Sequence, residues 1–292
     1  MTFETNKIIG QSPKLQEVLR TADLVAGTDV PVLISGDTGT GKDLFAKRIH
    51  QLSSRRQRPF VKVNCATESQ SLLIDDIKKG VIGKARSGTL FLDEITALSD
   101  SLQLKLLQFL ETDNQDVRLI VSTQKNLFDE VNAGNFRAEL FYRLNVIPVE
   151  LPALKEREGD VELLMDYFMR RFVAEQHQAM PSFSKSAFKK INQYDWSGNV
   201  RELHNFCERM FILFSGREVD VTNLPHEFGQ YSANPANPFV LPLTGVNLEM
   251  VEVDLIQQAL QSSAGNKSRA ARLLGLSRDT FLYRLKKYSI NT

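Results

Sequence analysis

The sequence has 292 residues, of which 42% are hydrophobic and 24% are charged, and its formal net charge is +1. This composition is ordinary for a soluble globular protein of about two domains, and the net charge alone indicates no nucleic-acid or membrane partner. Cys65 and Cys207 have no metal-ligand spacing and exclude a disulfide framework. No signal peptide and no apolar run of spanning length is present, so we expect a cytoplasmic protein without membrane contact.

Short apolar runs rich in β-branched residues alternate with helical patterns in the first half of the chain. Helical spacing of apolar residues covers 43–52 and 101–110. Strands that alternate with helices predict an α/β fold with a parallel sheet. The expected strands are VPVLIS (30–35), FVKVN (60–64), TLFLD (89–93), VRLIVST (117–123) and VIPVEL (146–151).

The second half of the chain is expected to be helical. No strand pattern follows Leu154, residues 160–225 show helical spacing, and 225–245 is rich in Pro, Asn and Gly, as linkers are. A compact helical segment follows. The predicted domains are an α/β subdomain (1–153), a helical subdomain (154–228), a linker (229–245) and a terminal helical domain (246–292).

The stretch GDTGTGKD, residues 36–43, lies between a predicted strand and a predicted helix. A glycine-rich turn brings backbone N–H groups to phosphate oxygens, and the helix N-terminus favours negative charge. Lys42 is expected to reach the β and γ phosphates of ATP. The general pattern ends in Ser or Thr, which binds Mg²⁺, whereas this sequence has Asp43. The residues predicted to bind nucleotide are Gly36, Asp37, Thr38, Gly39, Thr40, Gly41, Lys42 and Asp43.

A second acidic motif, TLFLDEI, ends the third predicted strand. Asp93 is placed to bind Mg²⁺ through water, and Glu94 is placed to polarise an attacking water. Together with the phosphate loop, this pair predicts a nucleotide site at the carboxyl edge of the sheet.

These motifs resemble the AAA+ module of bacterial enhancer-binding proteins, the activators that work with sigma-54 RNA polymerase. The resemblance covers nearly the whole chain. Besides GDTGTGKD, it includes IIGQSPKLQEVLRTA (8–22), FVKVNCA (60–66), GNFRAELFYRLNVIPVELPALKERE (134–158) and WSGNVRELHN (196–205). The family's own phosphate loop carries an acid after the lysine, so the resemblance accounts for Asp43.

The resemblance implies roles for further residues. Ile8 and Ile9 would line the adenine pocket, and Asn64 would be the switch residue that holds the catalytic glutamate. Arg137 and Arg143 occupy the places of arginine fingers, which reach into the nucleotide of a neighbouring subunit. A finger supplied in trans would make activity depend on self-association. We expect a dimer, with a hexameric ring as a further assembly whose size the sequence leaves open.

Two further positions are implied at the γ-phosphate. Arg201 would be the sensor arginine of the lid. Thr123 is followed by Gln124, where the family usually has Asn, and the extra methylene of Gln moves the amide. We therefore leave open whether the protein is an ATPase with a useful rate.

The C-terminal segment, residues 247–290, resembles a Fis-type helix-turn-helix. From Asn266 onward it carries seven Lys or Arg residues and one Asp, and Ser277 is placed to cap a recognition helix from Arg278 to about Tyr288. Leu248 to Ser262 is the expected dimer contact, which implies a roughly palindromic site on double-stranded DNA. The candidate DNA-binding residues are Lys267, Arg278, Thr280, Tyr283, Arg284 and Lys287. The expected core residues are Ala270, Leu273, Leu274, Phe281 and Leu285.

Two loops are shorter than the family pattern. Members carry a GAFTGA loop that touches sigma-54, whereas this chain has KKGVIGKARSGTLFLDE within the stretch 71–95, and the second loop is reduced to FLETDNQDVRL. The resemblance also starts near residue 8, so no receiver or sensor domain is expected before it. We expect a nucleotide-dependent DNA-binding regulator that does not open sigma-54 promoters. It would act on another polymerase, repress, or antagonise a related AAA+ regulator. The alternatives are a conventional activator ATPase with a divergent loop and a non-hydrolysing, nucleotide-gated binding module.

Overall fold

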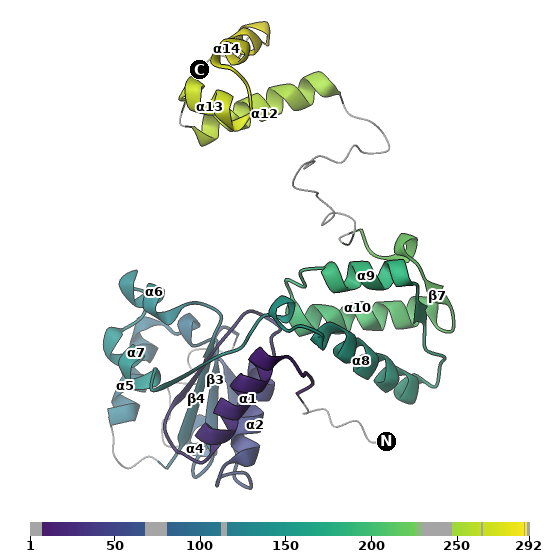
Figure 1. Cartoon of the computed structure of the whole chain (residues 1–292). Coiled ribbons are helices and arrows are strands. Elements are labelled where there is room, and N and C mark those ends of the chain that lie inside the picture. The colour runs from purple at the N-terminus through teal and green to yellow at the C-terminus, as the bar shows by residue number, and fades with distance from the viewer. Residues whose placement is uncertain are drawn as a thin grey trace. The chain divides into compact units, whose positions relative to one another are not determined.

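The computed structural model describes residues 8–67, 81–111, 116–226, 228, 247–263, 265–288 and 290. The chain divides into two compact units, Met1–Phe228 and Gly229–Thr292. Each unit has hydrophobic core residues of its own. Figure 1 shows the helices and strands of both units. No helix within the described ranges is long and apolar enough to cross a membrane. The expected linker, 229–245, lies outside the described residues.

A five-stranded parallel sheet with strand order β2-β3-β4-β1-β5 forms the first part of the larger unit. All five predicted strands are present. The first begins two residues later than expected, after Pro31, which has no N–H to donate to a ladder. The strands are β1 (Val32–Ser35), β2 (Phe60–Asn64), β3 (Thr89–Asp93), β4 (Arg118–Thr123) and β5 (Ile147–Glu150).

Helices cover both faces of this sheet, and alternate strand residues explain how. Val32 and Ile34 pack with α1 (Pro13–Ala26) and α2 (Lys42–Leu52) on one face. Leu33, between them, packs with α5 (Asp100–Glu111) and α7 (Ala138–Leu144) on the other face. Successive residues of β1 point to opposite faces of the sheet, and both faces are apolar, so helices cover the sheet on both sides. The α/β fold with a parallel sheet that the sequence predicts is confirmed.

Shorter elements connect the layers. They are α4 (Val81–Lys84), α6 (Leu127–Asn132) and three 3₁₀ turns, η1 (Ile95–Ala97), η2 (Leu154–Glu156) and η3 (Val221–Asn223). Residues 68–80 and 112–115, which include part of each loop expected to be shortened, lie outside the described residues, and Val81–Lys84 of the GVIGKA stretch form α4.

A helical lid follows β5. Its main helices are α8 (Asp160–Gln176), α9 (Lys185–Gln193) and α10 (Asn199–Phe214), and Trp196 is buried among them. The prediction that strands end at Leu154 was wrong in detail. Two-residue strands β6 (Ser182–Phe183) and β7 (Glu218–Val219) pair in parallel. Runs this short carry no periodicity that a sequence pattern can reveal.

The smaller unit contains three helices, α12 (Leu248–Ser262), α13 (Lys267–Leu273) and α14 (Arg278–Lys287). The bounds of α12 and the start of α14 agree with the prediction. Ala270, Phe281 and Leu285 are core residues as expected, and Leu274 packs against them. The expectation for Leu273 was wrong, because 58% of this residue is exposed at the last turn of α13.

Candidate functional site

The phosphate loop connects the end of β1 to the start of α2. Gly39 has a φ of +80°, and a Cβ there would lie 2.1 Å from the carbonyl oxygen of Gly198 in the lid. Gly41 caps α2 with a φ of +100°. Only glycine adopts these conformations at low cost and allows the lid backbone to come this close. The loop glycines therefore set both the turn and the lid contact.

Lys42 is the first residue of α2 and is almost buried. Its Nζ donates to the carbonyl oxygens of Gly36 and Asp37 at 2.7 and 3.3 Å, and lies 3.5 Å from Glu94 Oε1. The lysine that the sequence assigned to phosphate and the glutamate that it assigned to water activation thus form an ion pair. Both side chains are positioned before any phosphate has to be bound.

Acidic side chains gather at the carboxyl end of β3. Asp93 Oδ1 accepts a 2.5 Å hydrogen bond from Ser122 Oγ, and Oδ2 lies 3.0 Å from Lys62 Nζ. Glu94 has a left-handed backbone, with a φ of 58°, which turns the chain away from the strand. Its Oε2 accepts a 3.3 Å hydrogen bond from the backbone N of Gln124. Backbone strain of this kind is found where a side chain is held for function.

The lid is attached directly to the phosphate loop. Asn199, with a φ of 54°, donates from Nδ2 to the carbonyl oxygen of Thr38 at 2.9 Å and accepts from Leu154 N at 2.7 Å. The backbone N of Val200 donates to the Gly39 carbonyl at 3.0 Å. The start of α10 is therefore fixed to the loop that is expected to hold phosphate.

Arg157 adds another connection that the sequence did not predict. It is buried, and it donates to the carbonyl oxygens of Pro152 and Thr40, both at 2.9 Å. Burial lowers the pKa of its guanidinium, while the nearby Asp160 carboxylate opposes this shift. The residue ties the segment between sheet and lid to the phosphate loop.

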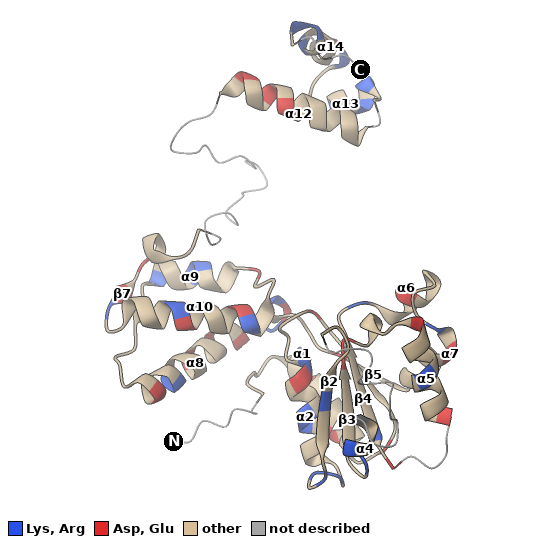
Figure 2. Ribbon diagram, turned by 180° about the vertical axis from the view of Figure 1, so that it is seen from behind, with Lys and Arg blue, Asp and Glu red and all other residues tan. Residues whose placement is uncertain are grey.

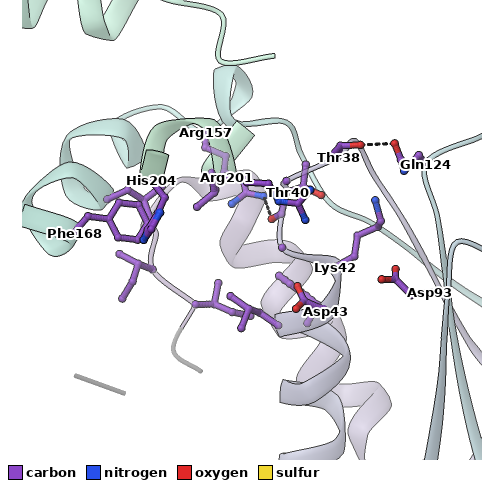
Figure 3. A pocket seen from close by; sticks show the side chains of 18 of the residues that line it. Thr38, Thr40, Lys42, Asp43, Asp93, Gln124, Arg157, Phe168, Arg201 and His204 are labelled. Atoms are coloured by element: carbon purple, nitrogen blue, oxygen red, sulfur yellow. Dashed lines mark hydrogen bonds between the residues drawn. The ribbon is translucent and has the colours of Figure 1, made fainter. Parts of the chain in front are cut away.

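A pocket of about 490 Å³ lies between the phosphate loop, the acidic end of the sheet and the lid. Phe168 and His204 lie side by side at one end, with ring centroids 5.0 Å apart, and Lys42 and Asp93 lie at the other (Figure 3). One end is thus aromatic and apolar, and the other is charged. This polarity suits a ligand that has a flat base at one end and phosphates at the other.

Most residues predicted to bind nucleotide line this pocket. They are Ile8, Ile9, Thr38, Gly39, Thr40, Gly41, Lys42, Asp43, Asn64, Asp93, Glu94 and Arg201. Gly36 and Asp37 belong to the loop, but they contribute their carbonyls to Lys42 and do not line the pocket. Sequence reasoning missed Lys62, Arg157, Phe168 and His204, because only the folded chain brings β2 and the lid to the phosphate loop.

The predicted sensor position lies differently from the expectation. Thr123 is buried, and its Oγ1 bonds the backbone N and O of Lys125, both at 3.0 Å. Its neighbour Gln124 lines the pocket instead and accepts a hydrogen bond from Thr38 Oγ1 (Figure 3). Asn64 accepts from the backbone N of Ala66 at 2.9 Å. The side chain that contacts the phosphate loop is therefore Gln124, the residue that departs from the family pattern.

Arg137 and Arg143 do not line the pocket of their own chain. Arg137 precedes α7, where its backbone N donates to buried Gln103 at 2.9 Å, and its guanidinium lies 3.6 Å from Asp100. Arg143, in the last turn of α7, is half exposed and 3.9 Å from Glu111. Neither long surface ion pair holds its arginine strongly.

The donor atoms near Asp93 suit Mg²⁺. Asp93 and Asp43 both lie near Lys62 Nζ, at 3.0 and 4.0 Å, so two carboxylates face one cationic group. Among the described residues no cluster of three or more acidic, His or Cys side chains forms a metal cage. Mg²⁺ commonly binds one or two carboxylates plus phosphate oxygens and water, so this set fits the ion.

The smaller unit presents the expected helix-turn-helix. Ser277 Oγ accepts from Thr280 N at 3.2 Å and caps α14.

Acidic residues gather on α12 and basic residues on α14 (Figure 2). Arg284 forms an ion pair with Glu252, and Lys287 Nζ lies 3.6 Å from Glu249. Arg278, Thr280 and Tyr283 are exposed, whereas Arg284 and Lys267 are partly buried. Two of the candidate DNA-binding cations are thus paired within the unit.

Comparison with known proteins identifies the modules. Residues 8–150 match the sigma-54 interaction domain, 155–238 the AAA+ ATPase lid domain and 247–288 the bacterial regulatory protein, Fis family. The transcriptional regulatory protein ZraR of Salmonella typhimurium is 38% identical over 96% of this chain and 68% of its own length. The chain belongs to the bacterial enhancer-binding protein family. It is a transcriptional regulator of the sigma-54 activator type, with an AAA+ module and a Fis-type DNA-binding domain.

Other members of the family support this assignment. The regulatory protein AtoC of Escherichia coli is 34% identical over 99% of this chain and 69% of its own length. The crystal structure of NtrX from Brucella abortus in complex with ATP has a TM-score of 0.70 and 30% identity, and it matches 96% of this chain and 69% of that one. The complex of the same protein with ADP has a TM-score of 0.71.

Proposed function

We propose that this enhancer-binding protein binds ATP with Mg²⁺ in the pocket between sheet and lid and regulates transcription from DNA sites without opening sigma-54 promoters. The observation that carries the proposal is the pocket itself, where the phosphate loop, the acidic end of β3 and the first turn of α10 meet. NtrX, whose crystal structures hold ATP and ADP, supports the choice of ligand.

Each end of the pocket has a task in this proposal. The apolar end, with Ile8, Ile9 and Phe168, receives adenine, and Lys42 with the backbone of the phosphate loop receives the phosphates. Asp93 would hold Mg²⁺, and the ion would supply neutralisation of charge on the phosphates when bound. Glu94 orients the attacking water once Lys42 has moved from it to the phosphates. Arg201, on the lid, serves as the sensor arginine that contacts the γ-phosphate.

Arg137 and Arg143 act on the pocket of a neighbouring subunit in this scheme. Both lie outside the pocket of their own chain, and among the described residues the ion pairs of their guanidinium groups are long, at 3.6 and 3.9 Å. Cationic groups at the γ-phosphate stabilise the charge that develops during phosphoryl transfer. An arginine that serves the neighbour makes hydrolysis depend on self-association, as in a ring. Dimerisation through α12 would in addition direct the chain to a roughly palindromic site on double-stranded DNA.

The absence of sigma-54 promoter opening is inferred from the shortened loops. The alignment with ZraR runs over 307 positions, which is longer than this chain, so ZraR carries residues within the matched region that this chain lacks. Only residues 65–88 connect β2 to β3, and α4 is part of that connection. A chain that keeps the pocket but has lost the sigma-contacting tip would act on another polymerase, repress, or co-assemble with a related regulator.

A second candidate function is nucleotide-gated DNA binding without turnover. Gln124 favours it, because its side chain bonds Thr38 of the phosphate loop while its backbone N bonds Glu94. A glutamate engaged in this way is poorly placed to orient water. In that case ATP would set only the oligomeric state.

In vitro transcription tests the absence of promoter opening. The full chain, ATP and Mg²⁺ are added to sigma-54 polymerase on a promoter that carries the protein's own binding site, with a full-length GAFTGA-containing relative as positive control. We expect no open complexes from this protein, and inhibition of the relative if the two co-assemble. Robust ATP-dependent activation would show a conventional activator and overturn the proposal.

A further inference from the structure

Lys62 lines the pocket, and none of the roles assigned above uses it. It lies in the middle of β2, opposite Phe91 of β3 in the register of the sheet. Its Nζ is 5.6 Å from the centre of the Phe91 ring, which supports the aliphatic stem. The ring and the strand thus direct the ammonium toward the acidic end of the sheet.

The ammonium of Lys62 is shared by two carboxylates from different elements. It lies 3.0 Å from Asp93 Oδ2, at the end of β3, and 4.0 Å from Asp43 Oδ2, in the first turn of α2. The Asp93 side chain is only 15% exposed, so solvent screens its charge weakly. Ser122 Oγ already donates to its other oxygen at 2.5 Å. Because Ser122 occupies Oδ1, a cation binds Asp93 best at Oδ2, where Lys62 Nζ lies.

Asp93 is proposed above to hold Mg²⁺, and Asp43 adds a second carboxylate near the same lysine. An ammonium and a divalent ion within a few ångström repel each other, and the pair Asp43–Asp93 cannot fully neutralise both. Lys62 has a long, flexible side chain that is 38% exposed, so it is able to move aside. Metal binding thus requires the lysine to leave.

We propose that Lys62 is a tethered counter-ion of Asp43 and Asp93 that Mg²⁺ displaces when nucleotide binds. The inference rests on the proposed function, since Mg–nucleotide is the ligand. Two effects follow. Without metal, Lys62 shields the phosphates from the two carboxylates, so nucleotide binds even then. With metal, Lys62 competes and raises the concentration of divalent cation that the site requires.

Mn²⁺ binding followed by electron paramagnetic resonance measures this competition directly, with the full chain and saturating ADP. Lys62→Met removes the charge and keeps the apolar stem, and Lys62→Arg keeps the charge. Lys125→Met is the matched control, because Lys125 Nζ lies 3.0 Å from Glu130 Oε1 and does not line the pocket. Thermal unfolding of each variant confirms that it is folded.

We expect Lys62→Met to bind Mn²⁺ about tenfold more tightly than the wild type, and Lys62→Arg and Lys125→Met to stay within about twofold. In EDTA, the affinity of Lys62→Met for ADP should fall by about tenfold. Equal Mn²⁺ affinities in wild type and Lys62→Met would overturn the inference. So would a loss of ADP affinity that is the same with and without metal, because Lys62 would then bind phosphate directly.

The two proposals fail in distinguishable ways. A wild-type chain that binds no ADP contradicts the proposed nucleotide site. Mn²⁺ titrated without nucleotide then decides the inference, because Asp43 and Asp93 are present in either case. Tighter binding by Lys62→Met than by Lys62→Arg supports it, and equal binding overturns it.

Discussion

The nucleotide pocket and the helix-turn-helix hold their cationic side chains in different ways. In the pocket, Lys42 is almost buried and bonds carbonyl oxygens of its own loop together with Glu94. In the smaller unit, Arg284 and Lys287 are 37% and 46% exposed and pair with acids of α12. Lys42 is therefore held mainly by the backbone of its own loop, and salt alters this arrangement little. The helix-turn-helix is organised partly by surface ion pairs, which salt weakens.

The largest expected effect comes from a substitution in the core of the smaller unit, which should not affect the nucleotide pocket. Phe281 is fully buried in the small core of the second unit, where truncation leaves a cavity. Phe281→Ala should cost about 3–5 kcal/mol of the stability of that unit, and DNA binding should be lost. Nucleotide binding should stay within about twofold of the wild type, since the pocket belongs to the other unit. Urea unfolding and nucleotide titration check this, and a parallel loss of nucleotide affinity would show that the two units are coupled.

Removing the buried cation tests the pocket side of the comparison. Lys42→Ala takes away a phosphate ligand and leaves Glu94 without its 3.5 Å partner. We expect nucleotide affinity to fall by about 30-fold or more, because truncating one side of a buried charge pair costs about 2–5 kcal/mol. Lys125→Ala serves as the control. Fluorescent-nucleotide titration measures both variants, and an affinity of Lys42→Ala equal to that of the control would contradict the assigned role.

The cap of α14 gives a smaller effect. Ser277→Ala removes the oxygen that accepts from Thr280 N and should destabilise the smaller unit by about 1 kcal/mol. Ser277→Asp restores an acceptor and should recover most of this loss. Far-ultraviolet circular dichroism during thermal unfolding follows the change. If the alanine and aspartate variants unfold at the same temperature, the cap contributes nothing.

The surface ion pairs give the smallest effect. Glu252→Gln removes the acidic partner of Arg284 and leaves an acceptor for Tyr288 OH, which donates to Glu252 Oε2 at 2.6 Å. DNA affinity at low salt should rise by about two- to fivefold as the arginine is released, in line with about 0.2–1 kcal/mol for exposed pairs. The gain should shrink as salt is raised. A fall in DNA affinity would instead mean that the pair orients the recognition helix.

The sequence predicted those parts of the molecule that local patterns determine. The phosphate loop, the end of β3 and the Ser277 cap each depend on a few neighbouring residues. The structure brings the phosphate loop and the end of β3 to one pocket, and in the smaller unit Ser277 caps α14, as expected. Phe168, His204 and Arg157 were not predicted, because their role depends on how the lid docks on the loop through Asn199 and Val200. In the sequence, Phe168 and His204 look like ordinary positions of amphipathic helices, and Arg157 looks like an ordinary surface arginine.

The side chains of Leu273 and Thr123 lie differently from the expectation for the same kind of physical reason. Leu273 was assigned to the core from its apolar nature, but the last turn of α13 directs it to the surface. Thr123 was assigned to the site by position, but its hydroxyl bonds the Lys125 backbone, and Gln124 extends to Thr38 instead. In both cases the side-chain direction was decided by packing and hydrogen bonds that one sequence does not contain.

Phosphate release from ATP, measured as a function of protein concentration, tests most directly whether the nucleotide site is completed by a neighbouring subunit. Arg143→Ala is measured alongside, with Arg20→Ala as an exposed control arginine. The proposed function predicts turnover per subunit that rises with concentration, disappears in Arg143→Ala and persists in Arg20→Ala. Turnover that is independent of concentration, or unchanged in Arg143→Ala, would contradict it.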